Sequence, residues 1–164
     1  MDNLLSELLD VSIAHELNIS KLYTLFQELF EEDEDFWWQL SMEEQSHAAL
    51  LRNEKTILNP SGTLPENLLA TDLEALKVSN ANLESLIDAL TLNPPSREEA
   101  FMTAYDLEQS IGELHYQEFM NRKSCSLSDE LFKQLNQEDK DHADRIKTYM
   151  LAHGMIPDTP PKSK

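Results

Sequence analysis

Six ionisable side chains occupy positions where the helical pattern of this 164-residue sequence predicts apolar residues. They are Glu16, Glu44, His47, Glu108, Asp139 and His142. Burial of an isolated carboxylate or imidazole is costly unless another group compensates its charge. Carboxylate oxygen combined with neutral imidazole nitrogen suits iron or manganese, whereas zinc favours fewer ligands and often thiolate. The residue types therefore predict a metal site.

Four of these residues form two pairs with the same spacing, Glu44 with His47 and Asp139 with His142. Residues three apart on a helix lie on one face, so both members of a pair can reach the same space. The surrounding residues match as well, because each stretch consists of two acids, two other residues and a histidine. This similarity indicates that the two pairs have the same role.

Glu16 and Glu108 supply single carboxylates from two other helical segments. Each is followed seven residues later by a ring, Tyr23 in one case and His115 in the other. The two glutamates are 92 residues apart and the two paired histidines are 95 apart. The sequence is therefore a weak internal duplication, with one single carboxylate and one acid–histidine pair in each half.

Alternative assignments stay open for several neighbouring residues. Glu43 and Glu138 precede the chosen acids by one residue, but they point about 100° away around the helix. His115 is an interfacial histidine, which we favour, a group that contacts a metal ligand, or itself a metal ligand from the third helix. Tyr23 is either a core residue or a hydrogen-bond donor to a metal-bound carboxylate.

Apolar periodicity and turn signals predict four long helices that position these residues. They cover Asn3–Phe30, Asp33 or Asp35 to Leu58, Ser96 to Arg122, and Ser128 to His153. Short turns join the first two and the last two, which predicts two antiparallel hairpins. A connection over residues 59–95, with a short helix at about 82–92, joins the hairpins. Two hairpins joined by one long crossover predict an all-α, antiparallel four-helix bundle of ferritin-like type.

The positions of the predicted turns agree with the positions of the acids. In an antiparallel hairpin, residues at one level are equally far from the turn. The midpoint of Glu16 and Glu44 is residue 30, beside the acidic break at 31–35. The midpoint of Glu108 and Asp139 lies between residues 123 and 124, in a polar run. The predicted hairpins therefore place all six side chains near one level of the bundle.

This four-part pattern resembles the rubrerythrin family across roughly residues 5–150. The stretch that contains Glu98, Glu99, Ala100, Ala104, Leu107 and Glu108 is also similar to the third helix of that family. The resemblance implies that Glu16 and Glu108 are terminal iron ligands and that Glu44 and Asp139 bridge two irons. It also implies that His47 and His142 bind one iron each.

The sequence departs from the family pattern in several places. Asp139 replaces a glutamate, and its shorter arm affects either the bridge or one metal position. Tyr105 stands where rubrerythrins often have a further glutamate, which puts their redox-linked ligand exchange in doubt. No Cys-x-x-Cys pair follows the bundle, so any electron donor is expected to be a separate protein. Gln45 replaces the methionine that binds haem in bacterioferritins, so we expect no haem.

The resemblance implies a non-haem di-iron oxidoreductase that reduces peroxide or oxidises Fe(II). Its small-molecule partners would be iron and either O₂ or peroxide, and manganese or zinc could replace iron. An iron-binding, storage or delivery module without turnover is an alternative, and a helical interaction scaffold is another. A homodimer is expected from the family, and an apolar group at Phe36, Trp37, Trp38 and Met42 could form a partner surface.

Composition limits the partners, the cysteine chemistry and the cellular location that we expect for the protein. The formal net charge is −18, from 31 acidic and 13 basic residues, which disfavours nucleic acid and anionic membranes as partners. Cys125 is the only cysteine, which excludes an internal disulfide and a Cys-rich metal site. The sequence shows neither a signal peptide nor a membrane span, so a cytoplasmic protein is expected. We predict one bundle domain over residues 1–156 and a disordered tail over 157–164.

Overall fold

A computed structural model describes residues 3–58, 72–109 and 127–156 of the chain. These residues form helices and short connections, with no strand among them, which confirms the all-α prediction. The elements are α1 (Asn3–Leu29), the 3₁₀ turn η1 (Glu31–Asp33), α2 (Glu34–Leu58), α3 (Asp72–Leu92), α4 (Arg97–Glu108) and α6 (Leu127–Ala152). They belong to two compact units, an N-terminal unit (Met1–Pro94) and a C-terminal unit (Pro95–Lys164).

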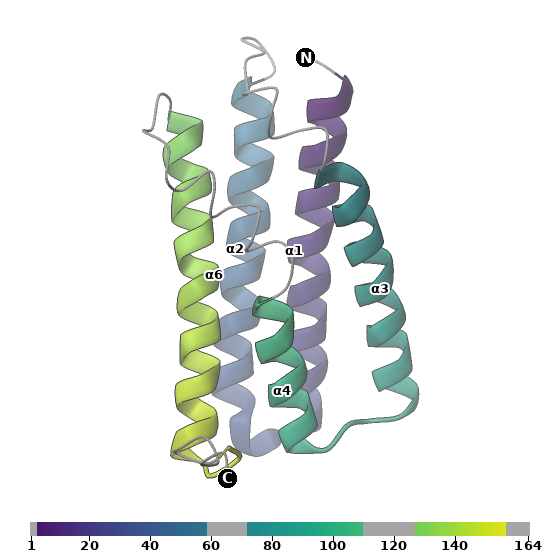
Figure 1. Cartoon of the computed structure of the whole chain (residues 1–164), viewed down its shortest axis with the longest axis vertical. Helices are drawn as coiled ribbons and strands as arrows, with labels where there is room; N and C mark the ends of the chain where they lie inside the picture. Colours follow the sequence, from purple (N-terminus) through teal and green to yellow (C-terminus); the bar gives the residue numbers. More distant parts are fainter. Residues whose placement is uncertain (1–2, 59–71, 110–126, 157–164) are drawn as a thin grey trace, which may run out of the picture. The chain divides into compact units, whose positions relative to one another are not determined.

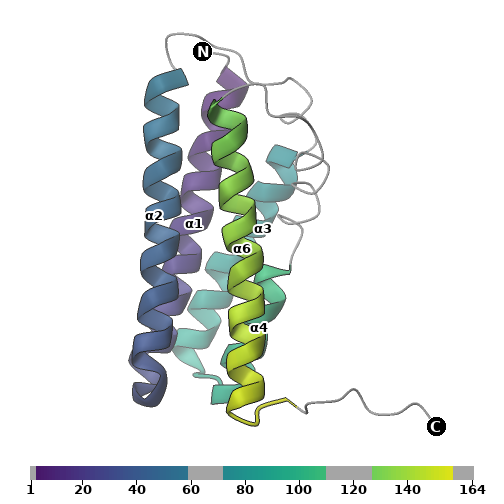
Figure 2. The ribbon, with the colours of Figure 1, turned by 90° about the vertical axis from the view of Figure 1, so that its left-hand side faces the viewer.

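Helices α1 and α2 form an antiparallel hairpin, as predicted (Figures 1 and 2). Trp37 is fully buried at its closed end, with its ring centroid 5.7 Å from that of Tyr23 and 5.1 Å from that of Phe26. Tyr23 and Trp37 are equally far from residue 30, which confirms the predicted position of the turn. Burial of a large apolar side chain contributes about 1.5–3 kcal/mol, so this aromatic cluster strongly stabilises the hairpin.

A group of hydroxyl side chains, here called the serine clamp, joins α1 to α2 above the aromatic cluster. Ser20 and Ser41 are buried, and their hydroxyl oxygens are 3.0 Å apart. The Ser41 hydroxyl also donates to the Ser20 carbonyl at 3.1 Å. Thr24 Oγ1 lies 3.0 Å from the Ser41 hydroxyl, and the Gln45 amide donates to the Ser20 hydroxyl at 3.2 Å. These hydrogen bonds fix how α1 and α2 are aligned along their length.

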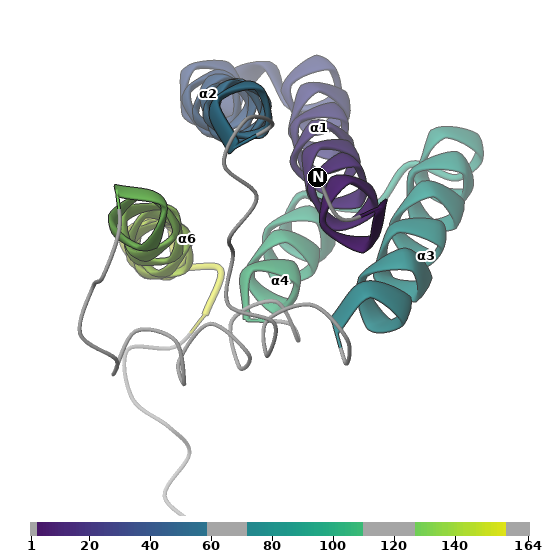
Figure 3. The same ribbon diagram turned by 90° about the horizontal axis from the view of Figure 1, so that it is seen from above.

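Helix α3 packs along α1 on the side away from α2 (Figure 3). Its Asn80 side chain is buried, donates to the Val11 carbonyl at 3.0 Å and accepts from Asn18 at 3.2 Å. Closer to the start of both helices, Lys77 pairs with Glu7 at 2.8 Å. The order of these contacts along the chain shows that α3 runs parallel to α1.

Helix α3 starts at Asp72, ten residues before the predicted start near Asn82. Three of the four residues from Ser79 to Asn82 are polar and interrupt the apolar periodicity just before the helix predicted at about 82–92. In the structure, the buried amide of Asn80 bonds to α1, so this run continues the helix instead of ending it. The correction follows from a tertiary contact that has no signature in the local sequence.

In the C-terminal unit, α4 and α6 run antiparallel and pack against each other. The rings of Phe101 and Tyr149 stack with centroids 5.2 Å apart and planes 5° apart. Ser96 and Glu99 form the predicted capping box: the Ser96 hydroxyl accepts from the Glu99 amide at 3.2 Å, and the Glu99 carboxylate accepts from the Ser96 amide at 2.8 Å. The predicted start of α4 is thereby confirmed.

The ends of α6 agree only in part with the sequence prediction. Gly154 follows the helix with a φ of 71°, a conformation that favours glycine. The amides of Gly154 and Met155 bond to the carbonyls of Leu151 and Met150, which caps the helix as a Schellman motif. The helix starts at Leu127, so the predicted cap residue Ser128 lies within its first turn.

Several predictions fall outside the described residues. They concern the helix stop at 59–62, the third helix beyond residue 109, His115, the polar run up to residue 126 with Cys125, and the tail from residue 157. Among the helices that the structure describes, none has the length and apolar character needed to cross a membrane.

The apolar group at the start of α2 is divided by the packing. Trp37 is fully buried and Phe36 is half-buried, whereas Trp38 and Met42 are 53% and 42% exposed. The predicted dimer surface could therefore use only part of this group. The homodimer itself stays a prediction.

Candidate metal centre

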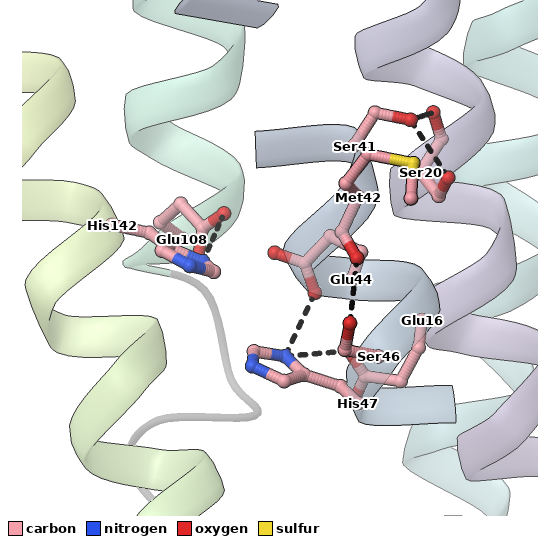
Figure 4. A network of polar contacts seen from close by, with 9 residues as sticks. All are labelled: Glu16, Ser20, Ser41, Met42, Glu44, Ser46, His47, Glu108 and His142. Atoms are coloured by element: carbon pink, nitrogen blue, oxygen red, sulfur yellow. Dashed lines mark hydrogen bonds and ion pairs between the residues drawn. The ribbon is translucent and has the colours of Figure 1, made fainter. Parts of the chain in front are cut away.

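The N-terminal unit brings three of the predicted ligands together. Glu16 comes from α1, and Glu44 and His47 come from α2 (Figure 4). The His47 Nδ1 atom lies 3.1 Å from Glu44 Oε2 and 3.7 Å from Glu16 Oε2. One donor atom from each residue lies within 4.8 Å of the other two. The separation of these atoms allows one metal ion to contact all three.

Local geometry explains this convergence. Glu44 and His47 are three residues apart on α2, so they lie on the same face of the helix. Glu16 lies opposite them on α1 because the hairpin register is centred on residue 30. The serine clamp lies one turn away, since Ser20 follows Glu16 by four residues and Ser41 precedes Glu44 by three. The two helices are thus aligned by hydrogen bonds close to the candidate site.

The three side chains are mostly removed from water. His47 and Glu44 are 2% and 1% exposed, and the Glu16 side chain is 17% exposed. The pKa of Glu16 is raised to about 7: burial raises it most, the hydrogen bond with His47 lowers it, and the nearby Glu44 carboxylate raises it. Burial lowers the pKa of His47, but hydrogen bonds to Glu16 and Glu44 outweigh this effect and raise it to about 11. Without metal, a protonated His47 donates to Glu44 and forms an ion pair with Glu16.

The C-terminal unit contains the corresponding acid–histidine contact. Glu108 on α4 and His142 on α6 are both buried, and His142 Nδ1 lies 3.7 Å from Glu108 Oε1 (Figure 4). This distance equals that between His47 Nδ1 and Glu16 Oε2 in the other unit. The proposed duplication thus has a structural counterpart, because each antiparallel pair of helices sets a glutamate against a histidine.

Asp139 is the predicted ligand whose side chain is not among the described residues. It lies on α6, three residues before His142. The side chain of Glu138, its alternative by one residue, is likewise outside the described residues. The role of Asp139 as a bridging ligand therefore stays a prediction.

On α2, the structure distinguishes Glu44 from its alternative Glu43. Glu44 is buried and contacts His47. Glu43 is half-buried and accepts a hydrogen bond at 3.0 Å from the exposed Gln39. Of these two acids, Glu44 is therefore the one placed to share a metal ion with His47.

Other residues considered in the sequence have identifiable contacts. Tyr23 is fully buried and stacks on Trp37, as expected of a core residue. Tyr105 is half-buried, and its hydroxyl accepts from the Gln109 amide at 2.7 Å. Gln45 is exposed and donates to Ser20.

The sequence reasoning missed the serine clamp and the bonds of Asn80 to α1. Both involve small polar residues whose burial becomes evident only when the facing helix is known. Ser20 could have been noticed because it follows Glu16 by one helical turn. Nothing in its local sequence identifies Ser41 as its partner.

The donor set fits the predicted metals. Two carboxylates and one imidazole supply oxygen and nitrogen ligands of the type that iron and manganese accept. At a pH between about 7 and 11, where His47 is protonated and Glu16 is ionised, the cluster of the N-terminal unit carries one net negative charge with Glu44 ionised. A divalent cation in place of the proton would neutralise it. The arrangement can therefore bind a metal, and its charge favours doing so.

We compared the chain with protein-family models, curated proteins and solved structures, and none of these comparisons gave a match.

Proposed function

We propose that this protein binds two iron ions between its helices and acts as a non-haem di-iron oxidoreductase that reduces peroxide or oxidises Fe(II). The ligands would be Glu16, Glu44 and His47 from the N-terminal unit, and Glu108, Asp139 and His142 from the C-terminal unit. In this proposal, the two antiparallel helix pairs close into one ferritin-like four-helix bundle.

The observation that carries the proposal is the repeated contact between a buried glutamate and a buried histidine. Both distances are 3.7 Å, and both contacts join antiparallel helices. A histidine–carboxylate contact in a single place could serve stability alone. The same contact in both halves of a duplicated chain is the pattern expected when each half contributes ligands for one ion.

Burial of the ligands supports a metal site with restricted access to water. His47, Glu44 and His142 are each at most 2% exposed, so competing ligands from solvent have little access to them. The Glu16 side chain is 17% exposed and that of Glu44 is 1% exposed, so solvent reaches the cluster mainly at Glu16. A small oxidant such as peroxide could approach a bound ion from this side.

When bound, a pair of ferrous ions supplies the two electrons needed to reduce peroxide. The residues of the chain would fix the ions, neutralise their charge and release the protons that otherwise occupy His47 and Glu16. Return of the centre to its reduced state would require electrons from a donor, because the residues proposed here hold the ions and supply no electrons themselves.

The test is the metal content of the full-length chain purified from iron-supplemented cells. We expect about two irons per chain, with near-ultraviolet absorption from the ferric form. Glu44→Gln and His47→Ala should lower the iron content. Glu43→Gln is the matched control because it removes a charge one residue away, and it should leave the iron content unchanged.

An iron content that is unaffected by Glu44→Gln and His47→Ala would contradict the proposed ligands. A purified chain that has no iron and no affinity for added Fe(II) would leave only the scaffold alternative. Stopped-flow mixing of the ferrous protein with peroxide separates an oxidoreductase from a storage or delivery module. Oxidation that is fast and repeated after re-reduction supports the enzyme, whereas slow oxidation without repeated turnover supports storage.

A further inference from the structure

We propose that the two metal positions are unequal, and that the ion held by Glu16, Glu44 and His47 binds first and more tightly. This inference rests on the proposed metal-binding function and adds an order of loading to it. It is carried by the convergence of three ligands in one unit, and by differences in charge and ligand length between the two halves of the chain.

The first argument is the assembly of the ligands within one compact unit. Glu16, Glu44 and His47 all belong to the hairpin of α1 and α2, and their donor atoms lie within 4.8 Å of one another. The serine clamp holds the two helices in register beside them. A site whose ligands are already in place loses little conformational freedom when the ion binds.

The second argument comes from the residues that correspond in α2 and α6. With His47 aligned on His142, buried Ala48 matches buried Ala143, and the cores of the two helices agree. Several positions differ, and among those three or four residues from the histidine, which share its helix face, Leu50 in α2 corresponds to Arg145 in α6. Arg145 therefore adds a positive charge to the face of α6 that carries His142, where α2 has the neutral Leu50.

The third argument is the distribution of charge along the chain. Residues 1–94 contain 18 acidic and 4 basic residues, a net charge of −14. Residues 95–164 contain 13 acidic and 9 basic residues, a net charge of −4. The N-terminal unit therefore attracts a divalent cation more strongly, although salt screens the distant part of this difference.

The fourth argument is ligand length. Glu44 reaches His47 across one helical turn, and its counterpart in the other half is Asp139, which is one methylene shorter. The contacts of Glu16 with His47 and of Glu108 with His142 have equal lengths, so this part of the ligand set does not distinguish the two positions. In this inference the shorter arm of Asp139 weakens the metal position of His142, so ligand length and charge both favour the N-terminal position.

The experiment is a titration of the metal-free full-length chain with Co(II), followed by visible absorption and by calorimetry. In the wild-type chain, we expect the first equivalent to bind with a Kd at least about tenfold below that of the second. His142→Ala should keep the tight first equivalent and lose the weaker one. His47→Ala should lose the tight equivalent, while His15→Ala, which removes a histidine outside the ligand set, should behave as the wild type.

A second variant tests the inference independently of whether His47→Ala folds. Arg145→Leu removes the charge that has no counterpart in α2, so the second equivalent should bind about threefold or more tightly while the first is unchanged. Loss of the first equivalent in His142→Ala, or equal affinities for both ions in the wild type, would overturn the inference and leave the two-iron proposal intact. Conversely, a wild-type chain that binds one ion, lost only in His47→Ala, would refute the two-iron proposal and support the N-terminal position.

Discussion

Metal binding at the N-terminal position should release protons, and the number follows from the two shifted pKa values. Hydrogen bonds to two carboxylates raise the pKa of His47 to about 11, so its imidazole is protonated at neutral pH without metal. Burial raises the pKa of Glu16 to about 7, so this carboxyl group is about half protonated at pH 7. A metal ion binds neutral imidazole and ionised carboxylate, so both groups must lose their protons.

The protons lost by His47 and Glu16 together predict a release of about 1.5 protons per ion at pH 7, about two at pH 5.5 and about one at pH 9. Because protons compete with the metal, affinity rises with pH. Near pH 7 the apparent association constant should increase about 30-fold per pH unit, and near pH 9 about tenfold. The association constant rises more steeply at low pH because Glu16 also loses a proton there. At high pH only the proton of His47 is released, so the rise is less steep.

The assay is calorimetric titration of the His142→Ala chain with Co(II), in buffers of equal pH and different ionisation enthalpy. This variant isolates the N-terminal position, and the dependence of the heat on the buffer gives the proton count directly. Glu43→Gln in the same background should give the same count, because Glu43 bonds to Gln39 and is not a member of the cluster formed by Glu16, Glu44 and His47. A release below about 0.5 protons at pH 7, or an affinity that is constant from pH 6.5 to 8.5, would show that His47 is not protonated in the metal-free protein.

Three further substitutions test how the helices are held. Ser41→Ala removes the hydroxyl that joins α2 to α1 and should lower the free energy of unfolding by about 1–2 kcal/mol in urea titrations, whereas Ser46→Ala on the exposed face should change it little. Asn80→Leu removes the bond to the Val11 carbonyl; it should cost about 1–3 kcal/mol and speed amide exchange in α3. Ser96→Ala removes the cap of α4 and should cost about 1 kcal/mol, which Ser96→Asp should largely restore.

Local sequence was sufficient for the features that depend on periodicity and on turn chemistry. The apolar spacing around Tyr23 and Trp37 predicted which face of each helix is buried, because a helix repeats every 3.6 residues. The acidic break at 31–35 predicted the turn, and symmetry about residue 30 then placed Glu16 opposite Glu44. Ser96 and Glu99 predicted the start of α4, since a capping box is made by residues three apart.

Other features depend on residues that are distant in sequence. The early start of α3 depends on Asn80, whose buried amide is stable only because it bonds to α1. The pairing of Ser20 with Ser41 likewise requires the two helices to be side by side. A polar side chain is buried at such a position only if it forms a hydrogen bond there, and the sequence alone does not identify the residue that bonds to it.

The sequence by itself determined the types and spacing of the candidate ligands, because the duplicated pattern of glutamate, acid and histidine is present in the chain as written. Only the tertiary structure decided their protonation and their geometry. A pKa of about 11 for His47 requires two carboxylates close enough to outweigh the effect of burial, which lowers this pKa. One of these, Glu44, is a neighbour on the same helix, whereas Glu16 is 31 residues away and reaches His47 only because α1 packs against α2.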